Sequence, residues 1–416
     1  MKFSVQRMLY FPPAIDTMPI KLPPRDLLFA RAYYFAFIGG WGFILPFVNL
    51  FYVSIGLSGT QIGTIASLSA VVGLVVSPVV VTEIKKLPQA RMILQLCLVL
   101  GALGYFLLGH QTFFAAILII IFFHTIITSA IMPTSDAMAV RVAEDHGTGY
   151  GSVRLWASVG WILTVLSSGW LIERFGYLAG FSGVALMWTL SAGLILFIRS
   201  DYFVARTGIN ISKPSVRSAV RHVLHDRTLL GFAVTVILVG FLNNGVLQFE
   251  NVFLSELGAS KQLIAVAGVL SAIMEIPFMI YADRFVRRAG AHRVMLIALV
   301  MISVQRAAVL LFPYIVTIMI VRFIGGISFS FYTISYVGLI SSRTKSTETG
   351  TVLALYTVTL AGLVNMIAAP ISGSIFDAVG ARWLYALAVT GYALGAFVLW
   401  LAKPAEERRA AEVNSL

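Results

Sequence analysis

Apolar residues recur along the chain in twelve long runs that are separated by short polar stretches. A run of about 20 apolar residues crosses the hydrocarbon core of a bilayer as an α-helix. The alternating ten-residue strands of a membrane barrel are absent, so the pattern predicts an all-α membrane protein. We expect transmembrane helices at 27–54, 60–82, 91–109, 112–143, 149–172, 178–199, 228–255, 261–284, 292–312, 314–342, 348–376 and 380–402.

The longest polar interruption lies between the sixth and the seventh run, at residues 200–227, and is rich in Arg, His, Lys and Ser. It predicts a cytoplasmic linker between two six-helix bundles, at 27–199 and 228–402. Residues 1–26 hold several prolines and no continuous apolar region, so they are expected to form a cytoplasmic tail and not a signal peptide. Residues 403–416 are expected to form a second cytoplasmic tail.

The two predicted bundles share short sequence features. Residues 168–176 and 372–380 both begin with Ser-Gly and end with Gly, and the Gly-Leu-Ser of 56–58 matches the Gly-Ala-Ser of 258–260. A twofold repeat of six helices is typical of transporters that bind a solute near the bilayer midplane and rock one half against the other. The alternative is that Gly and Ser are simply common at helix ends. We expect two pseudo-symmetric six-helix bundles.

Composition and charge support this interpretation. The chain is 59% hydrophobic and 12% charged, whereas a soluble domain has roughly 25% charged residues. Of the 30 Lys and Arg residues, 24 lie in the tails, the linker and the loops of one side, 3 lie on the other side and 3 lie inside the runs. By the positive-inside rule both termini are cytoplasmic and the protein lies in the cell membrane. The net charge of +12 therefore indicates a solvent-facing or lipid-headgroup-facing surface and no nucleic-acid partner.

Several function classes lack their sequence signals. The chain has no Walker loop, dinucleotide fingerprint, His/Cys cluster at metal spacing or nucleophile elbow. We therefore expect no enzyme activity, no cofactor and no metal, and we expect any transport to be driven by a gradient. The single cysteine, Cys97, excludes an intrachain disulfide.

One stretch of the first half places a cation, a hydroxyl group and a large aromatic ring on a single helix face. Arg154, Ser158 and Trp161 recur at i, i+4 and i+7. Asp136 precedes, and Arg154 follows, a loop centred near residue 145 by the same distance, so the two lie at similar depth. A membrane arginine costs roughly 2.5–3.5 kcal/mol and therefore needs a partner. These four residues are candidate solute ligands; the alternatives are a structural Asp136–Arg154 ion pair and a Trp161 that only packs.

In the second half, Glu250, Arg306 and Arg322 share a depth and are candidates for a charged cluster across three helices. Glu250 or Arg322 could instead extend to the membrane surface. Glu275 lies deeper, beside Pro277, where an ionised carboxylate is costly. Glu275 is our first candidate for a proton carrier and Glu250 the second, with the two arginines assisting. The alternative for Glu275 is a neutral, permanently hydrogen-bonded side chain.

Amide side chains add hydrogen-bonding capacity to the second half. Asn251 follows Glu250 directly, and we include it among the candidate solute ligands; contact between helices is the alternative role. The other amides are Asn243, Asn244 and Gln248 in the seventh run and Asn365 in the eleventh.

The features described above resemble those of a known protein family. The twelve-helix plan, and Asp283-Arg284 with its basic cluster, resemble the major facilitator superfamily. Residues 46–63 resemble the helix 1–2 junction of its lactose-permease-like and phenylpropionate- or nucleoside-permease-like branch. Residues 133–137 and 150–161 are similar to the helix 4–5 signature of that branch.

The resemblance implies roles for particular residues. In lactose permeases the positions of Asp136 and Arg154 bind sugar hydroxyls, and that of Trp161 stacks on the sugar ring. It also implies that Asp283 and Arg284 belong to a gating loop.

The chain departs from the pattern in two places. Loop 2–3 has Glu83 and Pro88 where the usual gating motif stands, and Gly325 and Ser328 occupy the helix-ten positions of a His and a Glu.

These features together predict a secondary active transporter. We expect proton-coupled symport of a small polar or ring-bearing solute, such as a sugar, a nucleoside or an aromatic acid, by a monomer in the lipid bilayer. Two alternatives remain open: a non-transporting relative that acts as a receptor or an assembly factor, and a solute or drug exporter of the same fold.

Overall fold

The computed structural model describes residues 24–84, 87, 89–204 and 216–403, and every regular element in these ranges is a helix. Most of both predicted tails, and residues 205–215 of the predicted linker, lie outside the described ranges. The helices of the first half are α1 (Arg25–Gly42), α2 (Val48–Ser54), α3 (Gly59–Ile84), α4 (Ala90–Leu108), α5 (Phe114–Thr128), α6 (Ile131–Asp145), α7 (Gly151–Phe175) and α8 (Tyr177–Leu194).

After α8 the chain forms three short helical elements and then the helices of the second half. Within the described ranges, eleven helical stretches are long and apolar enough to span a membrane, which agrees with the predicted all-α membrane fold. The short elements are η1 (Ile195–Phe197), η2 (Ser200–Tyr202) and α9 (Val216–His225). The second half contains α10 (Arg227–Leu242), α11 (Asn244–Glu256), α12 (Lys261–Ala289), α13 (Ala291–Leu311), α14 (Ile315–Ser341), α15 (Ser346–Ala354), the π-helical η3 (Leu355–Leu360), α16 (Ala361–Val379) and α17 (Ala381–Leu401).

The prediction of one continuous helix at 27–54 is wrong. This run forms α1 and α2, separated by a turn that contains Pro46. Proline lacks an N–H group and its ring clashes with the preceding helical turn, so the helix stops there. The run at 112–143 likewise bends between α5 and α6, just before Pro133. The run at 228–255 bends at Asn243, between α10 and α11.

Three prolines, two at the breaks just described and Pro370 inside α16, share one compensation. Each proline leaves the carbonyl four residues before it without its helical N–H partner, and a bilayer offers no water to replace it. In each case a serine hydroxyl of a neighbouring helix donates to that carbonyl. The three contacts are Ser168 to Gly42 before Pro46 (3.2 Å), Ser77 to Ser129 before Pro133 (3.2 Å) and Ser67 to Met366 before Pro370 (2.5 Å).

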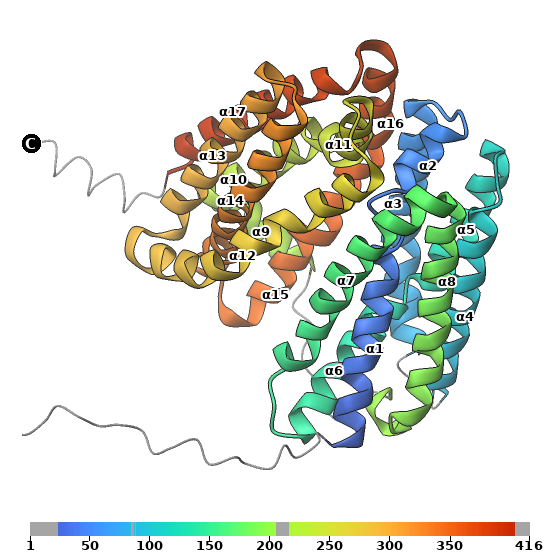
Figure 1. Cartoon of the computed structure of the whole chain (residues 1–416). Helices are drawn as coiled ribbons and strands as arrows, with labels where there is room; N and C mark the ends of the chain where they lie inside the picture. The colour runs from blue at the N-terminus through green and yellow to red at the C-terminus, as the bar shows by residue number, and fades with distance from the viewer. Residues whose placement is uncertain (1–23, 85–86, 88, 205–215, 404–416) are drawn as a thin grey trace, which may run out of the picture.

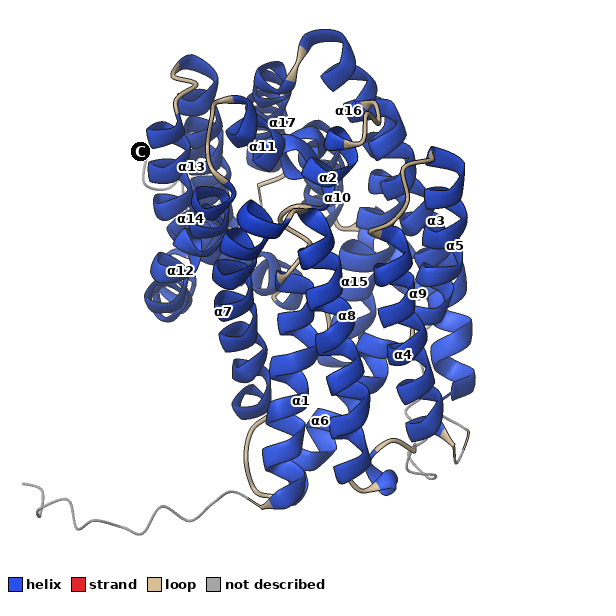
Figure 2. Ribbon diagram, turned by 45° about the vertical axis from the view of Figure 1, so that its right-hand side comes forward, coloured by secondary structure: helices blue, strands red, loops and turns tan. Residues whose placement is uncertain are grey.

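The two halves lie side by side, with α1–α8 in one and α10–α17 in the other (Figures 1 and 2). They meet where α3 packs on α16, α7 on α12 and α2 on α11. Four turns at one end each contain a glycine with positive φ, at Gly56, Gly176, Gly258 and Gly380. We call this the distal end, and the opposite end, where the described chain begins and stops, the proximal end.

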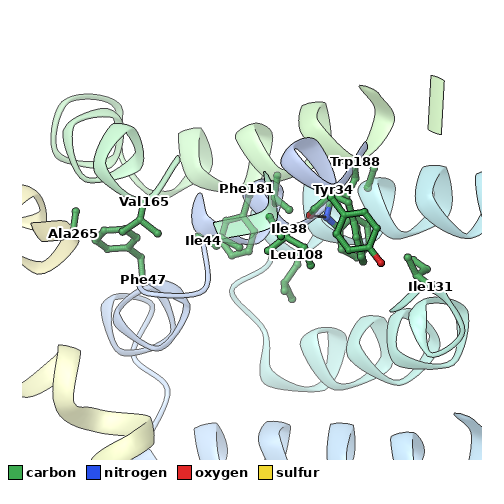
Figure 3. Close-up of a cluster of buried hydrophobic side chains, with 14 of the residues drawn as sticks. Tyr34, Ile38, Ile44, Phe47, Leu108, Ile131, Val165, Phe181, Trp188 and Ala265 are labelled. Atoms are coloured by element: carbon green, nitrogen blue, oxygen red, sulfur yellow. Dashed lines mark hydrogen bonds between the residues drawn. The ribbon is translucent and has the colours of Figure 1, made fainter. Parts of the chain in front are cut away.

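The hydrophobic core runs through the first half and continues into the distal part of the second. Trp188 is its largest buried side chain and fits against Gly40 and Gly101, where a Cβ atom would clash with the indole. Figure 3 shows Phe47 next to Val165 and Ala265, at the place where α7 meets α12. The core therefore joins the two halves at the distal end.

We expect the serine contacts at the proline breaks to stabilise the fold. Replacing Ser77 or Ser168 by alanine leaves a buried carbonyl without a donor, and should lower stability by roughly 1 kcal/mol each. The measurement is the melting temperature of the purified protein in detergent. Ser167→Ala is the matched control, because Ser167 is exposed and bonds only within its own helix. Equal shifts for all three variants would contradict the interpretation.

Candidate functional site

A cavity of ≈ 1100 Å³ occupies the interior of the second half, with α3 of the first half along one side. Along α14 it extends from Val321, near the distal end, to Tyr336, near the proximal end. Its lining is mostly apolar with polar side chains at intervals, as in small-molecule sites. The polar and charged lining residues are Ser69, Asn243, Asn244, Glu250, Ser271, Glu275, Gln305, Arg306, Arg322, Ser328, Thr357 and Asn365, with Tyr332, Tyr336 and Tyr392.

The charged cluster that the sequence predicted is present at the distal part of this cavity. Glu250 accepts hydrogen bonds from Arg306 at 3.1 Å and from Arg322 at 2.9 Å. The hydroxyl of Tyr385 donates to the same carboxylate at 3.0 Å. The three charged side chains are each only 16% exposed. Two guanidinium groups share one carboxylate, so the cluster keeps one net positive charge beside the cavity.

Asn251 joins this cluster to the first half. Its amide donates to the main-chain oxygen of Pro46 at 2.8 Å, and its side-chain oxygen accepts from Arg322 at 2.6 Å. Close by, Asn49 donates to the main-chain oxygen of Gln248 at 2.7 Å. The turn between α1 and α2 is therefore hydrogen-bonded to α11, and Asn251 lies at the junction of the halves and not among the cavity-lining residues.

Glu275 lies on the wall of the cavity and is partly buried. Within the described ranges its carboxylate forms no ion pair or hydrogen bond, while its main-chain oxygen accepts from Ser330 at 3.0 Å. Gly326 lets α14 approach the α12 backbone here, since a Cβ would lie 2.6 Å from the Glu275 nitrogen. Glu275 is thus held on a fixed backbone with a carboxylate that no described side chain neutralises.

The amides of α11 and α16 form a chain of hydrogen bonds. Asn244 donates to the side-chain oxygen of Asn365 at 2.7 Å, and Gln248 donates to Asn244. The side-chain oxygens of Asn243 and Gln248 are buried and, as far as the described residues go, have no donor. Asn243 is 3% exposed and lines the cavity. A ligand with hydroxyl or amino groups would supply the missing donor.

Three tyrosines and Gln305 on the cavity wall were not among the site residues predicted from the sequence. Tyr332 and Tyr336 lie with ring centroids 5.8 Å apart, and Gln305 accepts from Ser328 at 3.1 Å. The spacing from Arg322 through Tyr332 and Tyr336 keeps one face of a helix. That face could have been found by extending the pattern from Arg322 along the run.

In the first half, Tyr34 lies between the two residues that were expected to pair. Asp136 accepts from the hydroxyls of Tyr34 at 2.6 Å and Tyr150 at 2.8 Å. The guanidinium carbon of Arg154 lies 5.9 Å from the centre of the Tyr34 ring. Over the described chain, Asp136 and Arg154 form no direct ion pair, and the buried Nη1 of Arg154 has no acceptor. Arg154 therefore keeps hydrogen-bonding capacity for another molecule.

The face formed by Arg154, Ser158 and Trp161 is separate from the outer face of α7. Leu155 and Leu163 are 61% and 52% exposed and mark the side of the helix away from the protein. Trp161 is half-buried against the core, and Ser158 is exposed. Asp136, Arg154, Ser158 and Trp161 are not among the residues that line the cavity of the second half.

The expected gating loop is part of a helix. Asp283 and Arg284 lie in the last turns of α12, which continues to Ala289 and ends at Gly290. The predicted end of this helix at residue 284 is too early, because the charged residues that follow continue the helix to Ala289. The gating role of Asp283 and Arg284 stays a prediction. Asp283 forms an ion pair with Arg287 one turn later, and Arg284 lies over the ring of Tyr281 at 5.9 Å.

The chain is similar to several bacterial transporters. It is 29% identical over 273 residues to the maltose permease of Geobacillus stearothermophilus, covering 64% of this chain and 66% of that permease. It is 24% identical over 382 residues to the uncharacterized transporter YwbF of Bacillus subtilis, covering 88% and 92%. The crystal structure of the nucleoside transporter NupG has the same fold, with a TM-score of 0.75 at 16% identity, covering 91% of this chain and 99% of NupG.

The resemblance noted in the sequence is confirmed by these matches and by a sequence model. That model, of the MFS_1 like family, matches residues 27–387, which is most of the described chain. With the fold described above, the chain belongs to the MFS_1-like family of the major facilitator superfamily.

Proposed function

We propose that the protein is a secondary active transporter that carries a small, polar, ring-bearing solute across the cell membrane by alternating access. The observation that supports this most is the ≈ 1100 Å³ cavity, whose wall holds polar groups that lack protein partners in the described chain. Similar proteins are named a maltose permease and a putative nucleoside transporter.

The side of the membrane follows from the charge distribution. The basic residues cluster at the proximal end, which we assign to the cytoplasm together with both termini. The halves are joined at the distal end by Asn251 to Pro46 and by Asn49 to Gln248. The structure then represents a state that is closed towards the outside.

The chemistry of the cavity favours a polyhydroxylated solute. The side-chain oxygen of Asn243 and the carboxylate of Glu275, which both line the cavity, are acceptors, so they suit a ligand that carries several donors. Tyr332 and Tyr336 offer ring faces for a planar or sugar ring. A sugar or a nucleoside satisfies both requirements.

The first half would contribute the opposite side of the pathway. We propose that Arg154 donates to the solute through its available Nη1, while Tyr34 and Tyr150 hold Asp136 in place. Ser158 and Trp161 continue the same face along α7. When the halves rock, this face and the cavity wall would close on the solute from both sides.

Proton coupling would centre on Glu275. Closing the cavity around an ionised carboxylate that has neither water nor a cation costs several kcal/mol. A proton on Glu275 removes that cost, so the solute-loaded cavity would close around Glu275 only with the proton bound. Solute and proton would leave on the other side, and the empty carrier would return without the proton, with water in place of the solute. Glu250 is the second candidate, and it would have to separate from Arg306 and Arg322 before it could take up a proton. Coupling through either carboxylate would make the protein a proton symporter.

Substitution of two tryptophans of α7 tests whether the face of Arg154, Ser158 and Trp161 contacts the solute. Trp161→Ala should raise the KM for uptake roughly three- to tenfold, because a ring contact contributes about 0.5–1.5 kcal/mol. Trp156→Ala is the matched control; Trp156 is 41% exposed and lies off that face, so its KM should not change. The measurement is initial uptake by cells that express equal amounts of each variant. An equal effect of both substitutions would argue against a solute contact at Trp161.

Substitutions of Glu275 test whether this residue couples proton movement to solute transport. Glu275→Gln should abolish accumulation against a gradient, since a neutral side chain cannot load and release a proton, while solute exchange across proteoliposomes continues. Glu275→Asp should restore part of the accumulation. The measurement compares proton-driven uptake with counterflow in the same preparation. Full accumulation by Glu275→Gln would show that the proton is carried elsewhere.

A further inference from the structure

At the distal end, a carboxylate of the second half caps a helix of the first half. Asp377, near the end of α16, accepts from the main-chain N–H of Gly59 at 2.5 Å and of Thr60 at 2.8 Å. The hydroxyl of Thr60 donates to the same carboxylate at 2.7 Å. Gly59 and Thr60 are the first two residues of α3, where N–H groups have no partner within the helix.

The mirror contact runs in the opposite direction. Glu173, near the end of α7 in the first half, accepts from the main-chain N–H of Gln262 at 3.0 Å. Gln262 is the second residue of α12 in the second half. A carboxylate at this position also interacts favourably with the positive end of the helix dipole.

The two contacts occupy equivalent places in the repeat. Thr60 and Gln262 each follow a positive-φ glycine of the distal turns by four residues. Glu173 and Asp377 each precede the next such glycine by three residues. Each half therefore supplies one carboxylate and one helix start, and the pair is related by the pseudo-twofold axis of the molecule.

Each of these two helix starts also has a capping serine from its own half. The carboxylates therefore bind N–H groups that the local caps do not reach. Ser58 accepts from the N–H of Gln61 at 3.2 Å, and Ser260 accepts from that of Leu263 at 3.1 Å. These serines satisfy the third residue of each helix. The N–H groups of Gly59, Thr60 and Gln262 are satisfied from the other half of the molecule, so each contact depends on the distance between the halves.

Small residues let the helices of the two halves approach closely, so that each carboxylate reaches the helix start of the other half. A Cβ on Gly59 would lie 2.5 Å from the main-chain oxygen of Gly373, and a Cβ on Gly169 would lie 2.6 Å from the Cβ of Ala265. The paired helices thus touch backbone to backbone beside each carboxylate. Separation of the distal ends would break both contacts at once.

We propose that Asp377 and Glu173 are positioning residues that latch the distal gate. They stabilise the state that is closed towards the outside, and both latches open when the solute enters from that side. The assignment rests on alternating access as the proposed function, but it makes a claim about the conformational equilibrium that does not require the solute to be known.

The test uses one cysteine in the cavity. Ala70 lines the cavity on α3, and Ala70→Cys is introduced after the native Cys97 is replaced by serine. A membrane-impermeant maleimide is added to intact cells, which exposes the distal side, and to inside-out vesicles, which exposes the proximal side. The variants are Asp377→Asn, Glu173→Gln and their combination. Glu256→Gln, an exposed acid at the distal end of α11, is the matched control, and Asp377→Glu is the conservative variant.

We expect each latch variant to raise distal labelling roughly threefold, because a carboxylate at an exposed helix start contributes about 0.3–1 kcal/mol. The double variant should raise it about ninefold if the two latches act independently. Proximal labelling should fall in the same variants. Glu256→Gln and Asp377→Glu should label as the parent does.

Two outcomes would overturn the proposal. Distal labelling that stays at the parent level in the double variant would show that the carboxylates do not hold the gate. Labelling that rises from both sides would show loss of the fold instead of a shift between states. Increased distal labelling in a protein that moves no solute would leave the latch in place and overturn the transport proposal, so the two failures are distinguishable.

Discussion

The structure depends on the absence of water around its helices. A polar group inside a bilayer must find its partner within the protein, and most described groups do so. Three serines satisfy the carbonyls that prolines expose, and Glu250 is neutralised by two arginines and a tyrosine. Against this background, the exceptions are informative. The side-chain oxygen of Asn243 and the Nη1 of Arg154 are among the buried atoms that lack partners in the described residues. Together with the carboxylate of Glu275 on the cavity wall, they are the groups through which we propose that the protein binds its cargo.

The two halves agree in architecture and differ in chemistry. The distal turns, the serine caps and the Asp377 and Glu173 contacts are repeated, because both halves must fit the same closing surface. The interior is not repeated. The second half holds a polar cavity with a charged cluster, whereas in the first half the partly buried Asp136 is hydrogen-bonded to Tyr34 and Tyr150. We therefore propose that coupling belongs to the second half and that the first half adds a solute contact.

The sequence predicted the spans and the depth of the intramembrane charges well, because hydrophobic length and helical rise fix both. The cluster around Glu250 followed from depth alone. The split of the first run at Pro46 was missed, since the apolar run continues through the proline. The relation of Asp136 to Arg154 was missed in its detail, because Tyr34 comes from a helix a hundred residues earlier. Tyr332 on the cavity wall was not predicted, because aromatic residues are common in membrane helices and nothing in the sequence set this one apart.

The most direct test of the account is the melting temperature of the purified protein with a panel of sugars, nucleosides and aromatic acids, repeated for Asn243→Ala and Arg154→Ala. A ligand at 100 times its Kd stabilises the folded state by about 2.7 kcal/mol, which is readily seen. We predict that a sugar or a nucleoside raises the melting temperature of the parent protein and of neither variant. An equal increase in the parent and both variants would contradict the claim that the unpartnered groups bind the solute.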